Sequence, residues 1–432
     1  MNNVIKPFGV FLTLIFLLPF ISMAEEKQKK VLTGSITLAQ ALEITLLQNP
    51  DLQAYSYEIR ARDAQTLQAG LVKNPTLNVE VENAAGSGNF NAFDQSETTV
   101  QLSQLVELGE KRNLRKSSVN LSKEIAGWDY EVKRLEVLTR VSSSYIHVLK
   151  AQQKVLLTGE RVELAEKFIA TVSERIKAGK VAAIEKIKTE VALANIRLEE
   201  KKAKMEIENA RRKLSVLWGE TEPHFDSALG NLFSVPEKIF PKMKPLSVNP
   251  RLSKWSTAMA HRQAELDVEL SKTIPDVTLS GGYRRLEATS DNALVFGMTV
   301  PLNWFNRNQG GIAKARHRLS KTQQERKAEE LKVEEALLQA RGKVSFSHAK
   351  VISIKTEILP AAEKALSAMN EGYRFGKFGL LNVMDSQKLL YQFQNQYLNA
   401  LADYHNAITE VERLTGVDPV TWDKSAKGGT RP

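Results

Sequence analysis

Residues 75–108 read PTLNVEVENAAGSGNFNAFDQSETTVQLSQLVEL and have the pattern of a β-hairpin. Apolar and polar residues alternate on both sides of a loop that is rich in Gly, Asn and Ser, as they do in two paired strands. The pattern recurs in residues 275–302, PDVTLSGGYRRLEATSDNALVFGMTVPL. The apolar strand positions that stand out are Leu77, Val79, Val81, Val100, Leu102, Val277, Leu279, Leu294, Phe296 and Met298. Two isolated hairpins in a chain that otherwise reads as helix need an explanation.

The N-terminal segment, residues 1–24, has the composition of a secretory signal peptide. Lys6 precedes an apolar run from Val10 to Phe20, and small residues close the segment at Ala24. Because the run is short for a membrane-spanning helix, we expect cleavage; a membrane anchor is the alternative. The 432 residues contain no cysteine, so the exported chain is neither lipidated at the cleavage site nor held by disulfide bonds.

The formal charge of +10 is spread over sequences that mix basic and acidic residues. A basic excess can indicate nucleic-acid binding, but export argues against that partner. Mixed charge along helices is typical of faces that contact water. Beyond residue 24 no run of eighteen apolar residues occurs, so the sequence predicts no transmembrane helix.

Long helices account for most of the chain. Residues 25–35 read as a flexible start, and a helix follows from Thr37 to about residue 72, restarted by a capping residue and a proline at Asn49-Pro50. Residues 111–176 lack proline and keep apolar residues at helical spacing, which predicts a helix about 100 Å long with coiled-coil-like packing. The further helices expected are Ala182–Trp218, Ile312–Phe375 with a kink at Pro360, and Asn382–Leu414.

The second half of the chain repeats the plan of the first. Asn49-Pro50 recurs as Asn249-Pro250 after 200 residues. Matches 197 residues apart are Gln104-Leu105 with Pro301-Leu302, Gly179-Lys180 with Gly376-Lys377, and Gly219 with Gly416. We infer a tandem duplication of helix, hairpin, long helix, turn and helix. The chain then divides into a signal peptide (1–24), a first repeat (25–219), a Pro-rich connector (220–248), a second repeat (249–422) and a polar tail (423–432).

The length of the strands suggests a membrane location. Each has about the nine to eleven residues that a transmembrane strand needs, and lipid excludes open sheet edges because each unpaired backbone group costs several kcal/mol. Two hairpins supply only four strands, so the chain would share a barrel with copies of itself. Two copies would give an interior filled by side chains, and three would leave a lumen. The alternative is a soluble α+β protein with two exposed hairpins.

The sequence resembles the outer-membrane factor (TolC) family of efflux ducts over nearly all of the exported chain. Within it, the chain is similar to the CzcC-type subunits of heavy-metal RND efflux systems. The stretches that carry the resemblance are NPTLNVEVENAAGSG (74–88), ETTVQLSQLVELGEKR (97–112) and VPLNWFNRNQGGIAKA (300–315).

The resemblance implies a mainly α protein with membrane β-structure. It implies a homotrimer whose two hairpins per protomer form a twelve-stranded β-barrel in outer-membrane lipid, continued by a long periplasmic α-helical barrel. The partners implied are a periplasmic adaptor (membrane fusion protein) and a proton-driven inner-membrane RND pump.

The resemblance also marks two turns at the periplasmic end, SERIKAGKVAAIEKIKTE (173–190) and NEGYRFGKFGLLNVMDSQ (370–387). Glycine at the centre of each turn permits the left-handed backbone that a reversal needs. The residues expected to dock an adaptor are Arg175, Gly179, Lys180, Gly376 and Lys377.

By the same resemblance, Tyr373 ties the closed entrance, and Asp385 contributes one of three carboxylates around the pore. The family pattern has a second aspartate where this chain has Asn382, and an arginine where it has Phe378. The usual gate network is therefore only partly present. The alternative role for Asp385 is a favourable interaction with the dipole at the start of the last helix.

The sequence shows no pattern of catalytic, cofactor-binding or metal-ligating residues. Nucleophile elbow, P-loop and dinucleotide fingerprint are absent, and the pairs Gly281-Gly282 and Gly310-Gly311 read as turn or strand glycines. The histidines stand singly, without the paired spacing of metal ligands, at His147, His224, His261, His317, His348 and His405. We expect no enzymatic activity and no cofactor.

These observations favour a passive outer-membrane exit duct, with heavy-metal cations as the expected cargo. A duct of the same family for drugs or polypeptides is the first alternative. A periplasmic coiled-coil adaptor or structural protein without a barrel is the second, and the two strand-length hairpins argue against it.

Overall fold

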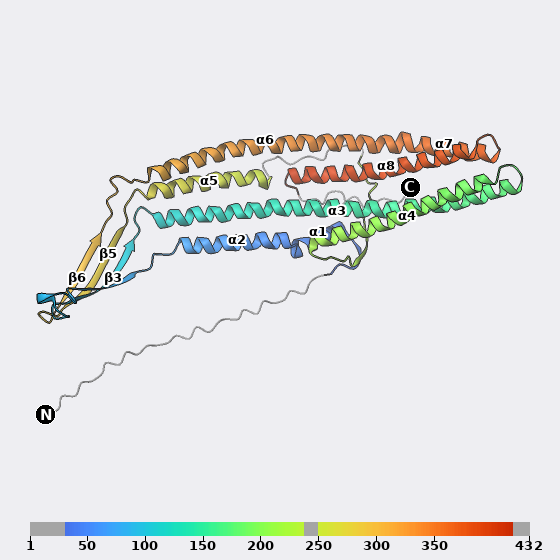
Figure 1. Cartoon of the computed structure of the whole chain (residues 1–432). Helices are drawn as coiled ribbons and strands as arrows, with labels where there is room; N and C mark the ends of the chain where they lie inside the picture. Colours follow the sequence, from blue (N-terminus) through green and yellow to red (C-terminus); the bar gives the residue numbers. More distant parts are fainter. Residues whose placement is uncertain (1–30, 237–248, 418–432) are drawn as a thin grey trace, which may run out of the picture. The chain divides into compact units, whose positions relative to one another are not determined.

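The computed structural model describes residues 31–236 and 249–417. The predicted signal peptide lies outside the described residues, as do residues 25–30, residues 237–248 of the predicted connector, and residues 418–432. The described residues from Leu32 onward form one compact unit, and its elements are labelled in Figure 1.

Each half of this unit contains a helix, a β-hairpin and a long helical hairpin (Figure 1). The first half comprises α2 (Pro50–Ala69), β2 (Thr76–Glu82), β3 (Glu97–Val106), α3 (Lys111–Lys177) and α4 (Ile184–Ser215). The second comprises α5 (Pro250–Ser271), β5 (Val277–Leu286), β6 (Asp291–Thr299), α6 (Gln309–Ser353), α7 (Leu359–Arg374) and α8 (Leu380–Leu414). The helix α3 packs along α2, α4, α5 and α8, and α6 packs along α8. The predicted hairpins and long helices are confirmed.

The repeated Asn-Pro pairs begin equivalent helices and fasten equivalent helix ends. Asn49 caps α2 and Asn249 caps α5, each through its side-chain oxygen, with proline at the first helical position, where an N–H would lack a helical partner. The Asn49 Nδ2 donates to the Leu217 carbonyl at 2.6 Å, and the Asn249 Nδ2 donates to the Leu414 carbonyl at 2.7 Å. The same contact therefore joins the end of each repeat to the start of the helix that precedes its hairpin.

The long helix of the second half is interrupted where the sequence predicts a kink. Between α6 and α7 the chain makes a π-helical turn, η4 (Ile354–Ile358). In a regular α-helix the ring of Pro360 would clash with the carbonyl of Thr356, and the wider turn relieves this clash. The helix α3, which has no proline, continues without interruption for 67 residues.

The predicted flexible start contains a strand, which is a correction. Gly34–Ile36 forms β1 and pairs in parallel with β4 (Phe225–Ala228) in the segment predicted as a connector. The Tyr145 hydroxyl contacts the carbonyls of Ile36 and Leu229 at 2.7 and 2.6 Å. Strands this short show no period of two, and their pairing joins distant parts of the sequence, so alternation could not reveal them.

Several helix ends differ from the predicted ones by a few residues, as helix termini commonly do. After α1 (Leu38–Gln48), α2 ends at Ala69 rather than near residue 72. The helix predicted to reach Trp218 is α-helical to Ser215 and ends in a 3-10 turn, η2 (Val216–Trp218). A second 3-10 turn, η1 (Gly88–Phe90), lies in the first hairpin loop, and α8 begins at Leu380 rather than Asn382.

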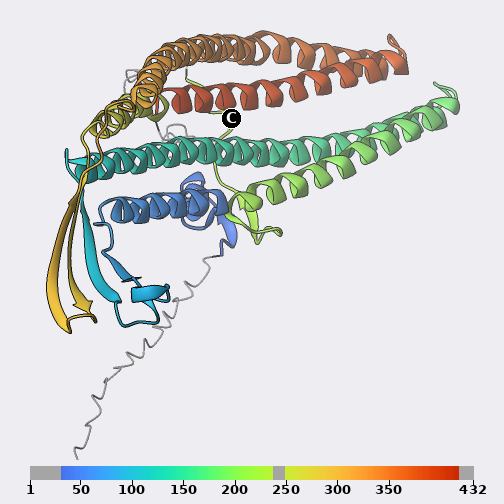
Figure 2. The ribbon, with the colours of Figure 1, turned by 60° about the vertical axis from the view of Figure 1, so that its left-hand side comes forward.

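The two hairpins join in one antiparallel sheet with the strand order β2-β3-β5-β6 (Figure 2). The middle strands pair with Val100 opposite Tyr283 and Leu102 opposite Gly281. Within the described part of the chain, β2 and β6 each have one neighbour. Their outer edges therefore present backbone donors and acceptors that can pair with another chain.

The register of the sheet gathers the apolar strand positions on one face. Leu77 pairs with Leu102, and Leu279 pairs with Met298, and side chains of directly paired residues lie on the same side. Most apolar residues of this face are exposed within the single chain, to 59% for Val79 and 80% for Phe296, and Val277 is half-buried. A continuous exposed apolar surface indicates contact with lipid or with another protein.

The opposite face of the sheet is polar. Arg284 donates hydrogen bonds to Glu97 at 2.9 Å and to Thr99 at 3.0 Å, and its guanidinium lies 3.5 Å from Glu82. The Gln101 amide donates to the Ser280 hydroxyl at 3.0 Å on the same face. The sheet thus has one face suited to an apolar medium and one suited to water.

The main core lies around the middle of α3 and the C-terminal half of α8, where β1, β4 and α1 cover the long helices. Trp218 and Phe225 are buried there with ring centroids 6.1 Å apart. Among residues 31–236 and 249–417, no helix has both the length and the apolarity needed to cross a membrane.

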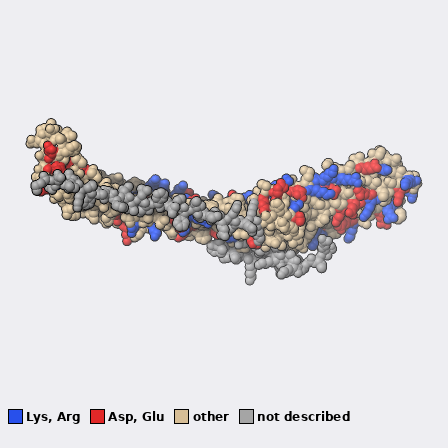
Figure 3. Space-filling model, turned by 90° about the horizontal axis from the view of Figure 1, so that it is seen from below, with Lys and Arg blue, Asp and Glu red and all other residues tan. Residues whose placement is uncertain are grey.

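Basic and acidic side chains are intermixed over much of the helical surface that Figure 3 displays. Exposed ion pairs such as Lys123 with Asp63 at 2.5 Å are typical of it, and each contributes at most about 1 kcal/mol. This distribution agrees with the prediction that the charges form faces in contact with water.

Candidate functional site at the helical tips

The turns that end α3 and α7 have the same hydrogen-bond pattern. The Lys180 N–H donates to the Arg175 carbonyl at 2.9 Å, and the Lys377 N–H donates to the Gly372 carbonyl at 2.8 Å. In each turn a glycine, Gly179 or Gly376, has a positive φ, +68° or +76°. This is the Schellman arrangement, which needs a left-handed residue at this position. The predicted reversal points are confirmed.

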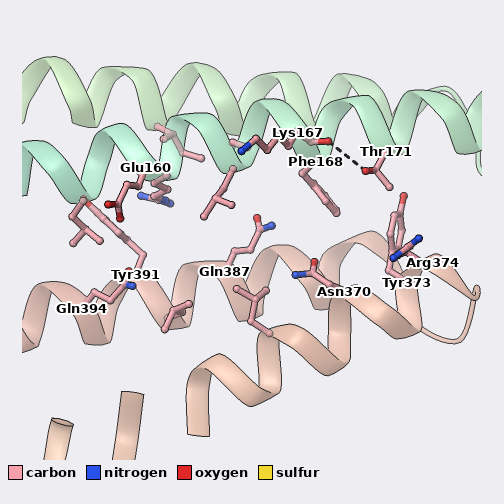
Figure 4. Close-up of a pocket in the computed structure, with 17 residues that line it drawn as sticks. Glu160, Lys167, Phe168, Thr171, Asn370, Tyr373, Arg374, Gln387, Tyr391 and Gln394 are labelled. Carbon is pink, nitrogen blue, oxygen red and sulfur yellow. Dashed lines mark hydrogen bonds between the residues drawn. The ribbon is translucent and has the colours of Figure 1, made fainter. Parts of the chain in front are cut away.

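Tyr373 joins the two helical hairpins close to these turns. Its side chain is 1% exposed, and its hydroxyl donates a 2.8 Å hydrogen bond to Oε2 of Glu185, in the first turn of α4. The Phe168 ring of α3 lies 5.6 Å from the Tyr373 ring, centroid to centroid, and the two side chains come from facing helices in Figure 4. A small apolar cluster, separate from the main core, surrounds them through Val172, Leu380 and Val383.

Burial, reinforced by the hydrogen bond to Glu185, raises the pKa of Tyr373 to about 12. A free tyrosine has a pKa of about 10. Because the folded-state pKa is the higher one, the link stabilises fully below about pH 10 and is lost as the pH rises toward 12. We therefore expect Tyr373→Phe to remove a tyrosine that ionises late in a spectroscopic titration of tyrosinate absorbance. Loss of a tyrosine that ionises near pH 10 would contradict this assignment.

Asp385 and Asn382 take no part in the hydrogen bonds around Tyr373. Both side chains are exposed on α8, where the Asn382 carbonyl accepts a bond from the Ser386 hydroxyl at 2.9 Å. Asp385 lies in the second turn, because α8 starts at Leu380. The dipole effect fades beyond the first turn, so the helix-start role considered for Asp385 carries little weight.

Four of the five predicted docking residues, Gly179, Lys180, Gly376 and Lys377, are exposed at the turns. Arg175 is different, because its guanidinium carbon lies 4.2 Å from the centroid of the Tyr373 ring. Its side chain thus belongs to the contact between the hairpins rather than to the outer surface of the turn.

Phe378 occupies the position at which the family pattern has an arginine. Its ring lies against Gly372. A Cβ added to Gly372 would come within 2.2 Å of the Phe378 ring, so glycine is what makes room for this aromatic side chain. An apolar contact thus replaces the charged one that the resemblance leads one to expect.

A cavity of about 280 Å³ opens beside Tyr373, between α3 and the α7–α8 hairpin (Figure 4). Arg161 lies in it with its guanidinium carbon 3.9 Å from the centroid of the Tyr391 ring, and it also forms an ion pair with Glu199. The cavity has a mixed lining of aromatic, aliphatic and polar side chains.

Three of the histidines make contacts with the main chain. His261, His348 and His405 each form a hydrogen bond with a main-chain carbonyl, and burial lowers the pKa of His405. Within the described ranges, no group of three His, Cys, Asp or Glu side chains is placed to hold a metal ion. The glycines at 281–282 lie in β5 and those at 310–311 in the first turn of α6.

Glu185 and Phe168 were not singled out by sequence reasoning. A signal for Glu185 was present, because it stands 197 residues before Asn382, the same offset that relates the two turns. The duplication thus puts a carboxylate in the first repeat where the second has an amide. No comparable signal marked Phe168, whose contact with Tyr373 depends on how the hairpins pack.

Residues 41–220 and 244–417 match the family described as outer membrane efflux protein, and the chain belongs to this family.

The relatives include metal-resistance proteins. The cobalt-zinc-cadmium resistance protein CzcC of Cupriavidus metallidurans is 32% identical over 89% of this chain and 90% of its own length. The nickel-cobalt-cadmium resistance protein NccC of Alcaligenes xylosoxydans is 25% identical over 67% of this chain and 68% of its own. The crystal structure of CusC superposes with a TM-score of 0.73 over 92% of this chain and 96% of that one, at 14% identity, which supports the fold.

Proposed function

We propose that the chain is the outer-membrane exit duct of a tripartite efflux pump, through which substrate leaves passively. The observation that carries the proposal is the four-stranded sheet with one apolar face and two open edges. Lipid does not tolerate an open edge, so β6 of one copy would pair with β2 of the next. Three copies would close twelve strands around a lumen, with the polar face of the sheet inward.

The helices would continue this barrel as a tube in the periplasm. Residues 1–24 would direct export and be removed, without lipidation because the chain has no cysteine. The exposed turns at Gly179 and Gly376 would meet a periplasmic adaptor, which connects the duct to a proton-driven inner-membrane RND pump. The surface charges are intermixed and the chain is expected to be exported. Both features argue against a nucleic-acid partner.

Heavy-metal cations are the cargo that the relatives favour. CzcC is named for resistance to cobalt, zinc and cadmium and NccC for resistance to nickel, cobalt and cadmium, and their similarity extends over two thirds or more of this chain. A duct for drugs or polypeptides is the alternative cargo class. A periplasmic adaptor or structural protein is disfavoured, because it would leave the apolar sheet face in water.

We further propose that Tyr373, Asn382 and Asp385 form the periplasmic gate, with the exposed Asn382 and Asp385 at the opening and the buried Tyr373 between the helical hairpins. The link from Tyr373 to Glu185 holds the α7–α8 hairpin against the α3–α4 hairpin in the closed state. In a trimer, Asp385 would supply three carboxylates around one axis, and such a ring attracts cations.

Conductance of the purified channel in a planar bilayer tests the duct and its entrance together. Asp385→Ala should abolish block by a trivalent cation, because the ring of charge is lost. Tyr373→Phe should raise the open probability, because the link to Glu185 is lost. Asp403→Ala, an exposed aspartate further along α8, is the matched control and should behave as wild type. If current, block and open probability were unchanged in both variants, the entrance would be closed elsewhere.

A further inference from the structure

Arg175 meets Tyr373 through the face of its ring. The guanidinium carbon lies 4.2 Å from the ring centroid. Nε and Nη1 are shielded from water and have no hydrogen-bond acceptor among the described residues. Shielding strengthens a cation–π contact, and a planar guanidinium stacks on an aromatic face better than an ammonium does.

The two turns fix the partners of this contact. The Arg175 carbonyl accepts the bond that closes the first turn, so the backbone of Arg175 is held by the turn at Gly179. Its Nη2 lies 3.8 Å from the point where Gly376 would carry a Cβ. A side chain at Gly376 would therefore sit beside the guanidinium, and glycine keeps this space open.

Tyr373 is consequently held by two helices other than its own. Phe168 and Arg175 of α3 contact its ring, while Glu185 of α4 accepts the hydrogen bond from its hydroxyl. The ring contacts restrict where the hydroxyl can lie, and the hydroxyl reaches a single carboxylate oxygen. The position of the ring thus decides whether the bond to Glu185 forms.

We propose that Arg175 is a positioning residue of the entrance, which stacks on Tyr373 and keeps its hydroxyl on Glu185. Arg175 thus provides a cationic contact from the first helical hairpin. In the second hairpin, Phe378 makes an apolar contact with Gly372. The inference rests on the proposed role of Tyr373 in closing the duct.

The test compares Arg175→Lys, Arg175→Gln and Lys177→Gln with the wild type, as purified full-length channels in planar bilayers without an adaptor. Arg175→Lys keeps the charge and loses the planar stack, and Arg175→Gln loses both. Each should raise the open probability by about fivefold or more. Lys177→Gln removes a charge from an exposed residue of the same helical turn and should leave it unchanged.

Combining each Arg175 variant with Tyr373→Phe separates positioning from a general effect of charge. In the Tyr373→Phe background, the Arg175 substitutions should add little, because no hydroxyl remains to be positioned; coupled residues are non-additive in this way. Arg175→Lys is conservative enough to keep the test decisive if Arg175→Gln fails to assemble.

Wild-type behaviour of Arg175→Lys, or fully additive effects with Tyr373→Phe, would overturn the inference and leave the proposed gate standing. An unchanged open probability in Tyr373→Phe itself would remove the gate, and the role of Arg175 with it. Loss of adaptor binding in Arg175→Lys, with unaltered conductance, would assign Arg175 to docking instead and overturn its positioning role.

Discussion

Phe296→Arg should remove most of the chain from the outer membrane. Phe296 lies on the apolar face of β6 and is 80% exposed in the single chain. A cation on the lipid face near the bilayer midplane of a barrel costs about 2–4 kcal/mol, and a trimer would incur this cost three times. Val79→Arg, on the same face of β2, should have the same effect. The measurement is the amount of protein in the outer-membrane fraction.

Asn78→Arg is the matched control for this experiment. Asn78 adjoins Val79 but lies on the polar face, where it pairs with Gln101. The same charge at this position would meet water in the lumen, so near-normal levels are expected. Normal levels of all three variants would show that the apolar face does not meet lipid.

Gly179→Val and Gly376→Val should abolish metal tolerance while leaving the assembled protein in the membrane. Both glycines have positive φ, and little or nothing lies within 4 Å of an added Cβ. The cost is therefore backbone strain, about 1–3 kcal/mol at each turn, and not a clash. Strain would change the shape of the turns that the adaptor is proposed to meet, far from the sheet.

Asparagine at the same positions provides the control, because it tolerates the left-handed conformation. Gly179→Asn and Gly376→Asn should keep most of the metal tolerance, even though asparagine, like valine, adds a side chain to each turn. If heavy-metal cations are the cargo, as proposed, tolerance is measured as growth on a divalent heavy metal in a strain that lacks the natural gene, and otherwise the readout is efflux of the cargo. Full tolerance in the valine variants would mean that the tips do not dock the adaptor.

The larger features of the fold could be predicted because each leaves a local pattern. Alternation marked both hairpins, a proline-free run marked α3, and Pro360 marked the break between α6 and α7. The offset of 197 residues related Gly179 to Gly376. The pairing of β1 with β4 left no such pattern, since both strands are short and their partners are distant in sequence.

The position of the candidate site at the helical tips could be predicted, but the side-chain contacts within it could not. The repeat pattern predicts the two turn glycines at the helix reversals, and the family resemblance adds Tyr373 beside the second one; the structure has all three there. The family resemblance implies a docking role for Arg175, whereas the structure places this side chain against Tyr373. Which side chains meet across two hairpins depends on their packing, and packing between distant segments leaves no periodic signal in either of them.

The mass of the purified channel in detergent tests the central claim, that the sheet of one chain is completed by other copies. Native mass measurement, with chemical cross-linking of the same sample, reports the number of chains in the particle. The account predicts three, because three copies of the open sheet close twelve strands around a lumen. A stable, membrane-inserted monomer would contradict it.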